Sequence, residues 1–285
     1  MIDGMPVLDD HMHCDPRHGE GMEAIKKFDR SGGTHLCVIN KPSWHLGVEP
    51  TRDDTGEEFR PVFEETLGVT EKASEILEGE AFPILGVHPA TLNQLCGRMN
   101  LENAERLMKE GMEVAAEYVR ENRAIGLKTG RPHYKLPDDM WKASNRIMKH
   151  GFELGADLGC AVQLHTEGYD DYHNKDHDGF HDIAEMARNA GMDTKHVVKH
   201  FSSPRVEQLT PSVLSRKEWL EEMLEEGREF MMETDYIDDP DRPGAVLGTR
   251  TVPKRVRSYI EGNEEQMYRS HVEMPEEVYG VEINL

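Results

Sequence analysis

The sequence predicts an α/β fold, a single (β/α)8 TIM barrel over residues 1–285. Short apolar runs alternate with longer amphipathic stretches rich in Glu, a pattern typical of strand–helix units around a parallel sheet. Eight such units can be counted, and 285 residues match the length of one barrel, about 250 residues. No linker or low-complexity tract separates the units. We therefore expect one domain.

Each predicted strand is a short run of apolar or β-branched residues, and the intervening segments have helical spacing. We expect strands at 5–10, 35–40, 82–87, 124–128, 161–164, 196–199, 211–214 and 229–233. We expect helices at 21–30, 61–80, 101–122, 137–158, 181–190, 216–226 and 253–261, several closed by a glycine. The unit from 198 to 214 is too short for a full helix, so the barrel should be irregular around its sixth and seventh strands.

The composition restricts the function. The chain has 55 acidic side chains against 33 Lys and Arg, a formal net charge of -22, which repels nucleic-acid backbones and anionic membranes at long range. The four cysteines form no CxxC pair, and no apolar stretch approaches the ~20 residues that span a bilayer. We expect a soluble, cytoplasmic protein without a membrane partner.

Histidines gather at the ends of the predicted strands. One polar residue or pair follows the first, third, fifth, sixth and eighth strands: His11 with His13, His88, His165, His200 and Asp235. The carboxyl ends of barrel strands meet at one mouth, so these side chains should lie close together. Imidazoles with a carboxylate suit zinc first, with manganese, magnesium or iron as alternatives. Alternate residues of a strand point the same way, so His11 and His13 can hold one ion together.

In this arrangement the sequence resembles the TatD-type metal-dependent hydrolases of the amidohydrolase superfamily. The matching segments are Asp9-Asp10-His11-Met12-His13-Cys14-Asp15 for DxHxHxD, Gly86-Val87-His88-Pro89 for GxHP, Leu164-His165-Thr166, Lys199-His200-Phe201-Ser202 for HCFSG, and Glu233-Thr234-Asp235 for ETD. They follow in order from residue 9 to about residue 255. The resemblance implies that His11, His13 and Asp235 hold one ion. It implies that His165 and His200 hold a second.

The fourth strand departs from the family pattern. TatD proteins carry a bridging Glu there, whereas this chain has Leu127 at the aligned position and Lys128 next to it. The phosphotriesterase branch of the superfamily uses a carboxylated lysine at this strand end. Three alternatives stay open: Lys128 is carboxylated and bridges two ions, it remains a cation that binds an anionic substrate, or the second ion binds weakly or not at all.

The resemblance also implies a mechanism. A divalent ion lowers the pKa of a bound water toward ~7 and so provides a nucleophile at neutral pH. Asp235 would orient that water and pass on its proton, and His88 would polarise a phosphoryl or carbonyl oxygen.

Three further residues are candidates for substrate binding. Arg131 and His133, just past the fourth strand, could clamp an anion, and Trp44 could line the pocket. Loop packing is the alternative for each of them. The polar segment 169–178 is a candidate lid or third metal site, with a plain solvated loop as the alternative.

Three functions remain in consideration. The first is a TatD-like phosphoesterase or deoxyribonuclease with one or two divalent ions per chain, acting on a small phosphoester or a nucleic-acid end. The second is a phosphotriesterase-like or lactonase-like ester or amide hydrolase with carboxylated Lys128. The third is a barrel that binds metal with little or no turnover.

Overall fold

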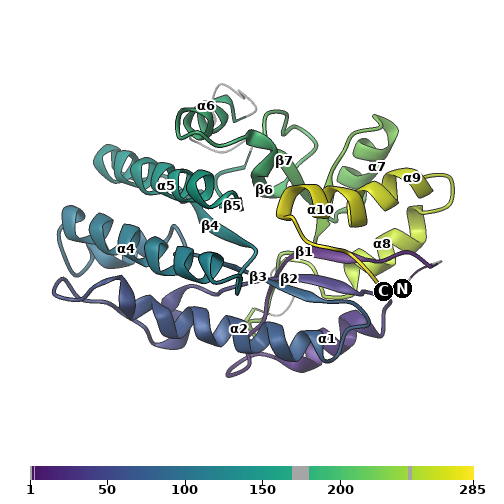
Figure 1. The fold of residues 1–285 in the computed structure, drawn as a ribbon, viewed down its shortest axis with the longest axis horizontal. Helices are drawn as coiled ribbons and strands as arrows, with labels where there is room; N and C mark the ends of the chain where they lie inside the picture. Colours follow the sequence, from purple (N-terminus) through teal and green to yellow (C-terminus); the bar gives the residue numbers. More distant parts are fainter. Residues whose placement is uncertain (1, 3, 169–179, 243–245) are drawn as a thin grey trace.

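The computed structural model describes residues 2, 4–168, 180–242 and 246–285. A parallel sheet curls into a barrel, and most of the helices lie around its outside (Figure 1). The strands are β1 (Leu8–His13), β2 (His35–Ile39), β3 (Ala81–Leu85), β4 (Gly126–Gly130), β5 (Ala161–His165), β6 (Val197–Ser202), β7 (Thr210–Leu214), β8 (Met231–Glu233) and β9 (Tyr236–Ile237). This confirms the predicted fold class.

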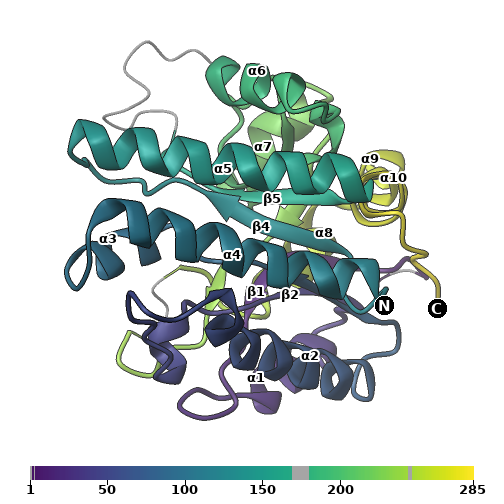
Figure 2. The same ribbon diagram turned by 60° about the vertical axis from the view of Figure 1, so that its left-hand side comes forward.

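Helices α1 to α7 lie between strands, as in strand–helix units, and α8, α9 and α10 follow the last strand. They are α1 (Met22–Asp29), α2 (Arg60–Ser74), α3 (Thr91–Cys96), α4 (Leu101–Arg120), α5 (Asp138–Leu158), α6 (His181–Asn189), α7 (Lys217–Glu225), α8 (Thr251–Tyr259), α9 (Glu264–Tyr268) and α10 (Met274–Tyr279). Shorter helical turns are η1 (Ser43–Leu46), η2 (Gly56–Phe59), η3 (Thr194–His196) and the π-helical η4 (Arg269–Glu273). Figure 2 shows α4 and α5 side by side on the outside of the strands.

The eighth strand closes the barrel in two pieces. The sheet order is β8-β7-β6-β5-β4-β3-β2-β1-β9, and all the strand pairs in it are parallel. β8 pairs with β7, and after only two residues the chain continues as β9, which pairs with β1 on the other side. Thr234 and Asp235, which separate β8 from β9, therefore lie where the two edges of the sheet come together.

Apolar clusters lie between the strands and the helices, and a further one joins residues of β1, β2, β3, β5, β6 and β8 with η4 and α10, whereas part of the barrel interior is polar. Phe63, Leu107 and Phe152 belong to a large buried cluster contributed by α2, α4, α5 and the strands they cover. Within the barrel, Asp10 and Gln163 are fully buried, and Gln163 donates a hydrogen bond to the Asp10 carbonyl. Buried polar groups cost free energy unless they are paired, and this hydrogen bond meets that requirement.

The element boundaries differ from the predicted ones in informative places. The first strand is Leu8–His13 instead of 5–10, so both histidines lie inside it. The helix predicted at 61–80 ends at Ser74, and α3, α9 and α10 were not predicted. As expected, the connection from β6 to β7 contains no helix.

No helix of the described residues is long and apolar enough to cross a membrane. The candidate lid or metal-binding segment 169–178 lies outside the described residues.

Candidate active site

The structure brings the predicted metal-binding residues together inside the mouth of the barrel. His11 and His13 come from β1, His165 is the last residue of β5, and His200 lies in β6. Asp235 lies in the break between β8 and β9.

β1 contains a register shift against β2 between Asp9 and Met12, next to these histidines. Bulges of this kind are common beside active sites, where they redirect a side chain.

His11, His13 and Asp235 form the first of two ligand groups. The Nε2 atoms of the two histidines are 3.3 Å apart. Asp235 Oδ1 lies 3.8 Å from the first and 3.9 Å from the second. All three residues are buried, with exposed fractions of 0%, 7% and 7%.

Hydrogen bonds fix the tautomers of both imidazoles. His11 Nδ1 lies 2.7 Å from Gln163 Oε1, and the Gln163 amide nitrogen donates to the Asp10 carbonyl, so Oε1 is an acceptor. His13 Nδ1 donates to the Ile39 carbonyl at 2.9 Å. Both Nδ1 atoms therefore carry the proton, and both Nε2 atoms present a lone pair.

Two lone pairs that face each other at this distance repel unless a cation lies between them. Burial, together with the charge of Lys128, holds the pKa of His11 and of His13 well below the usual histidine value, so both rings are neutral. Two nitrogens bound at about 2.0–2.1 Å to a tetrahedral zinc ion are about 3.3–3.4 Å apart. The spacing and the donor set of two imidazoles and a carboxylate therefore fit a divalent cation.

A second group contains His165 and His200. His165 Nδ1 lies 3.0 Å from His200 Nε2, and the ring of His200 stacks on that of His11 with centroids 4.0 Å apart. His200 Nδ1 faces Glu233 Oε1 at 3.3 Å. This contact assigns the proton to Nδ1, which leaves Nε2 as the ligand atom on the side of His165.

Glu233 was missed as a site residue at the sequence level. It is fully buried and also accepts hydrogen bonds from the Phe201 backbone N–H at 2.7 Å and from Ser212 Oγ at 2.6 Å. His11, His200 and Glu233 offer ligand atoms within 4.8 Å of one another. The sequence feature that could have identified Glu233 is its position at the end of the eighth strand, two residues before Asp235.

Lys128 lies between the two ligand groups. It stands in the middle of β4, is 1% exposed, and its Nζ is 3.2 Å from His11 Nε2. Among the described residues it forms no ion pair of 4.0 Å or less with a carboxylate. Burial lowers the pKa of this amine, while Asp235 and Glu233 oppose the shift. From this position Lys128 can interact with both ligand groups.

His88 follows β3 and contacts the second ligand group. Its ring centroid is 4.7 Å from that of His165, and Trp44 lies against it edge-on at 6.1 Å. The backbone N–H of Ala90 donates to His88 Nδ1 at 3.2 Å, so the ring proton is on Nε2. Burial holds the pKa of His88 well below the usual value. His88 is therefore a neutral hydrogen-bond donor.

A pocket of about 240 Å³ opens above these residues. It is lined by His13, Lys41, Pro42, Trp44, His45, His88, Ala90, Pro132, His133, Tyr134, His165, Asp235, Ile237 and Arg242. The predicted substrate-binding residues Trp44 and His133 are in this wall, and His133 Nδ1 lies 3.3 Å from His165 Nε2. The pocket thus has members of both ligand groups in its wall and aromatic and basic side chains around them.

Arg131, expected to bind an anion at this mouth, is placed elsewhere. It is 2% exposed, is not part of the pocket wall, and pairs with Glu167, which is also buried. Its backbone N–H donates to the His165 carbonyl, directly after Gly130, where a Cβ would come within 1.9 Å of that oxygen. This close crossing of the two chain segments turns the Arg131 side chain away from the pocket.

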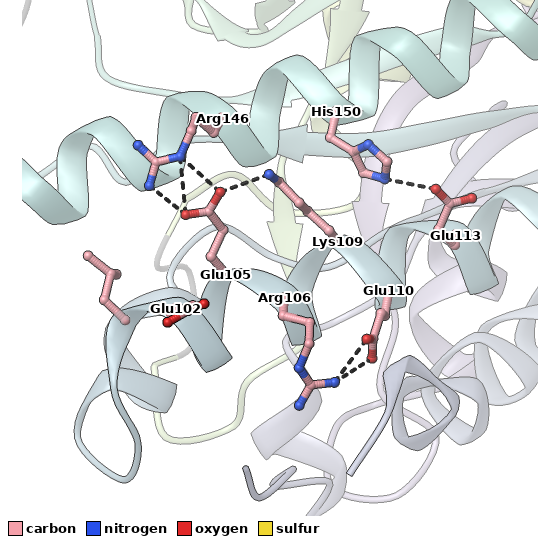
Figure 3. Close-up of a pocket in the computed structure, with 9 residues that line it drawn as sticks. Glu102, Glu105, Arg106, Lys109, Glu110, Glu113, Arg146 and His150 are labelled. Atoms are coloured by element: carbon pink, nitrogen blue, oxygen red, sulfur yellow. Dashed lines mark hydrogen bonds and ion pairs between the residues drawn. The ribbon is translucent and has the colours of Figure 1, made fainter. Parts of the chain in front are cut away.

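A larger cavity of about 700 Å³ lies on the outside of the barrel between α4 and α5 (Figure 3). Its charged side chains pair with one another: Arg146 and Lys109 with Glu105, Arg106 with Glu110, and His150 with Glu113. Surface ion pairs of this kind are common on helical faces. The convergent ligand atoms, rather than the size of the cavity, locate the candidate site at the barrel mouth.

Comparisons with known proteins show the family and the fold of the chain. The chain is 34% identical to the uncharacterized protein MJ1127 of Methanocaldococcus jannaschii, over all of this chain and 99% of that protein. The fold is similar to that of the lactonase Lmo2620 from Listeria monocytogenes, with a TM-score of 0.57, 10% identity and coverage of 96% and 94%. An organophosphorus hydrolase from Deinococcus radiodurans has a TM-score of 0.57, 12% identity and coverage of 97% and 92%. The model of the TatD-related DNase family matches residues 8–280, and the chain belongs to that family.

Proposed function

We propose that this protein is a metal-dependent hydrolase that cleaves phosphoester bonds in a small substrate or at a nucleic-acid end. One observation carries the proposal. The lone pairs of His11 Nε2 and His13 Nε2 meet at 3.3 Å beside the Asp235 carboxylate, and His13 and Asp235 line a pocket. Such a donor set suits a divalent cation, and family membership supports hydrolysis as the reaction.

Each residue has a separate task in this proposal. His11, His13 and Asp235 hold one ion, and His165 with His200 can hold a second. When bound, the ion lowers the pKa of water and polarises the scissile group. Asp235, buried beside the two imidazoles, would orient the attacking water and accept its proton.

His88 is the candidate electrophile of the pocket wall. Its Nε2–H is free of a partner among the described residues and its Nδ1 is occupied by the Ala90 N–H. A preorganised neutral donor stabilises negative charge that develops on a phosphoryl or carbonyl oxygen in the transition state.

Lys128 completes the site when it is carboxylated. The ammonium group would first lose one proton, and the neutral amine would then add to CO2 with loss of a second proton, so that a buried cation becomes a carbamate anion. A carbamate would place a negative charge between the two ligand groups, where it can interact with bound cations; among the described residues, the one recorded hydrogen-bond contact of the amine is with His11 Nε2 at 3.2 Å. We favour this state over a lysine cation, whose N–H would occupy the lone pair that His11 needs for a metal.

The pocket favours a small substrate. Its volume of about 240 Å³ lies below the usual range of ligand pockets, about 300–1,000 Å³. The net charge of -22 disfavours tracking along a duplex. A phosphate that reaches bound cations is compatible with both facts.

A second candidate is hydrolysis of a neutral ester, lactone or phosphotriester. Lys128 favours it, because the TatD pattern has no lysine at this position. The solved structures that resemble the fold include a lactonase and an organophosphorus hydrolase.

Metal analysis and a substrate panel test the proposal. Protein purified without chelator should contain one or two zinc, manganese or iron ions per chain. It should hydrolyse a phosphomonoester or a short oligonucleotide faster than a lactone or a phosphotriester. Asp235→Asn should abolish turnover while the circular dichroism spectrum stays unchanged.

Other results of the metal analysis and the substrate panel would support a different function. Preference for the lactone or the triester would support the second candidate. A protein that contains metal but hydrolyses none of these substrates would support the third function, a barrel that binds metal without turnover. Less than one ion per chain would overturn the hydrolase proposal.

A further inference from the structure

The backbone at Asp235 adopts a conformation that is unusual for its residue type. Its φ is +45°, in the left-handed region, where a residue with a side chain is strained unless its surroundings hold it. On one side Glu233 ends β8, and on the other Tyr236 begins β9 and pairs with Met12 of β1. Asp235 thus lies at the turn between two strand pieces that belong to opposite edges of the sheet.

No hydrogen bond from another described residue fixes the Asp235 carboxylate. Its nearest recorded polar contacts are the two Nε2 atoms of His11 and His13, 3.8 and 3.9 Å from Oδ1. The direction of this carboxylate is therefore set by the backbone on either side of it. Whatever holds Thr234 and Tyr236 determines where the ligand oxygen lies.

Asp9 holds Thr234 with both of its carboxylate oxygens. The Thr234 N–H donates to Asp9 Oδ1 at 3.0 Å, and Thr234 Oγ1 donates to Asp9 Oδ2 at 2.7 Å. The Tyr236 N–H in turn donates to Thr234 Oγ1 at 3.2 Å. Asp9 and Thr234 are both fully buried. The hydroxyl of Thr234 consequently connects the residue after Asp235 to the first strand.

The same carboxylate reaches the histidine ligands. The His11 N–H points to Asp9 Oδ1 at 3.3 Å, so one oxygen contacts the backbone of His11 and of Thr234. A carboxylate suits this task because it has two acceptor oxygens, whereas an amide would direct an N–H group at one of the donors.

We propose that Asp9 is a positioning residue that, through Thr234, holds the β8–β9 break and so sets Asp235 against His11 and His13. This inference rests on the proposed function, since it assumes that these three residues bind a divalent ion. Asp9 itself contacts neither substrate nor metal in this role. Groups that orient metal ligands typically contribute about 10–100-fold to metal affinity.

Cobalt titration of the metal-free protein tests the inference without any activity measurement. The key variant is Thr234→Val, which has nearly the same shape and removes only the hydroxyl. We expect it to bind Co2+ about 10–100-fold more weakly than the wild type, with a changed visible absorption spectrum. Thr234→Ser keeps the hydroxyl and should restore both properties, and Asp9→Asn should resemble Thr234→Val.

Thr210→Val is the matched control. Thr210 lies at the start of β7, and its Oγ1 donates to the Lys195 carbonyl at 2.7 Å, so this variant also loses one threonine hydrogen bond in a barrel strand. It should bind Co2+ with wild-type affinity and spectrum, even if its urea midpoint falls. Wild-type cobalt binding in Thr234→Val, or equal losses in Thr210→Val, would overturn the positioning role alone. A wild-type protein that binds no Co2+ would overturn the proposed function and the inference with it.

Discussion

The guanidinium of Arg131 and the carboxylate of Glu167 form a buried bidentate ion pair that joins the segments following β4 and β5. Nε donates to Oε2 at 2.8 Å, and Nη2 donates to Oε1. The remaining Nη1 donates to Asp182 at 2.7 Å and to Asn145 at 3.0 Å, and the ring of Trp141 lies 4.4 Å from the guanidinium carbon. The donors that the sequence suggested for a substrate phosphate are therefore used within the protein.

Replacing Arg131 should reduce stability strongly. Arg131→Met leaves the Glu167 charge buried without its partner, which typically costs about 3–5 kcal/mol in the free energy of unfolding. Urea denaturation followed by fluorescence measures this loss. Arg146→Met is the control, because Arg146 is half exposed in its pair with Glu105 and should cost about 1 kcal/mol or less.

The double variant Arg131→Met with Glu167→Leu tests the cause. Removing both charges should recover much of the stability, since no unpaired carboxylate remains. If Arg131→Met kept wild-type stability but raised KM, the substrate-binding role suggested by the sequence would be correct instead.

Carboxylation of Lys128 predicts chemical rescue. Lys128→Ala should lower kcat/KM by about 10²-fold or more, because a group between the two ligand sets is lost. A short-chain carboxylic acid added to this variant should restore part of the activity, and Lys128→Glu should retain it. Lys128→Gln is the matched control, because glutamine is similar in size to glutamate but has no charge. We expect its kcat/KM to stay low. Full activity of Lys128→Gln would contradict a bridging anion.

The fixed tautomer of His88 predicts that replacing this residue lowers kcat. His88→Ala should lower kcat by about 10²–10³-fold with little change in KM, because its Nε2–H acts on charge that develops in the transition state. His88→Gln keeps an N–H donor and should recover part of the rate. Steady-state kinetics with metal analysis of each variant makes the measurement. A loss of metal in His88→Ala would show instead that His88 supports the ligands.

The sequence was sufficient to predict the barrel and the residues that gather at its mouth. The carboxyl ends of parallel strands must converge, so the order of His11, His165 and His200 along the chain already places them together. The strand boundary at Leu8 was displaced in the prediction because the strand residues that follow Leu8 are polar although they are buried. A run such as Asp9-Asp10-His11 does not have the alternating apolar pattern of an ordinary strand.

The sequence could not show which neighbours orient these ligands. Gln163 and His11 are 152 positions apart, and their hydrogen bond depends on how β1 and β5 face each other across the barrel. The same holds for Asp9 and Thr234, 225 positions apart. Arg131 differs, because its direction follows from the tight passage of Gly130 past the His165 carbonyl, which no pattern of residue types encodes.

His271 predicts a specific pH dependence of stability. It is fully buried in η4, and burial lowers its pKa from 6.5 to about 4, against a hydrogen bond with the Leu8 carbonyl. The unfolded chain therefore binds a proton that the folded chain does not bind as the pH falls from 6.5 toward 4. The contribution of His271 to the free energy of unfolding is fully present above pH 6.5. It decreases on acidification, by about 2 kcal/mol between pH 7 and pH 5.

Comparison of wild type and His271→Gln isolates this contribution. Urea unfolding of chelator-treated protein at pH 7 and at pH 5 gives the free energy lost on acidification for each. The loss should be about 2 kcal/mol smaller in His271→Gln, because glutamine does not titrate. His181→Gln, at an exposed position at the start of α6, is the control and should lose as much as the wild type. An equal loss in wild type and His271→Gln would show that His271 is already accessible to protons in the folded protein.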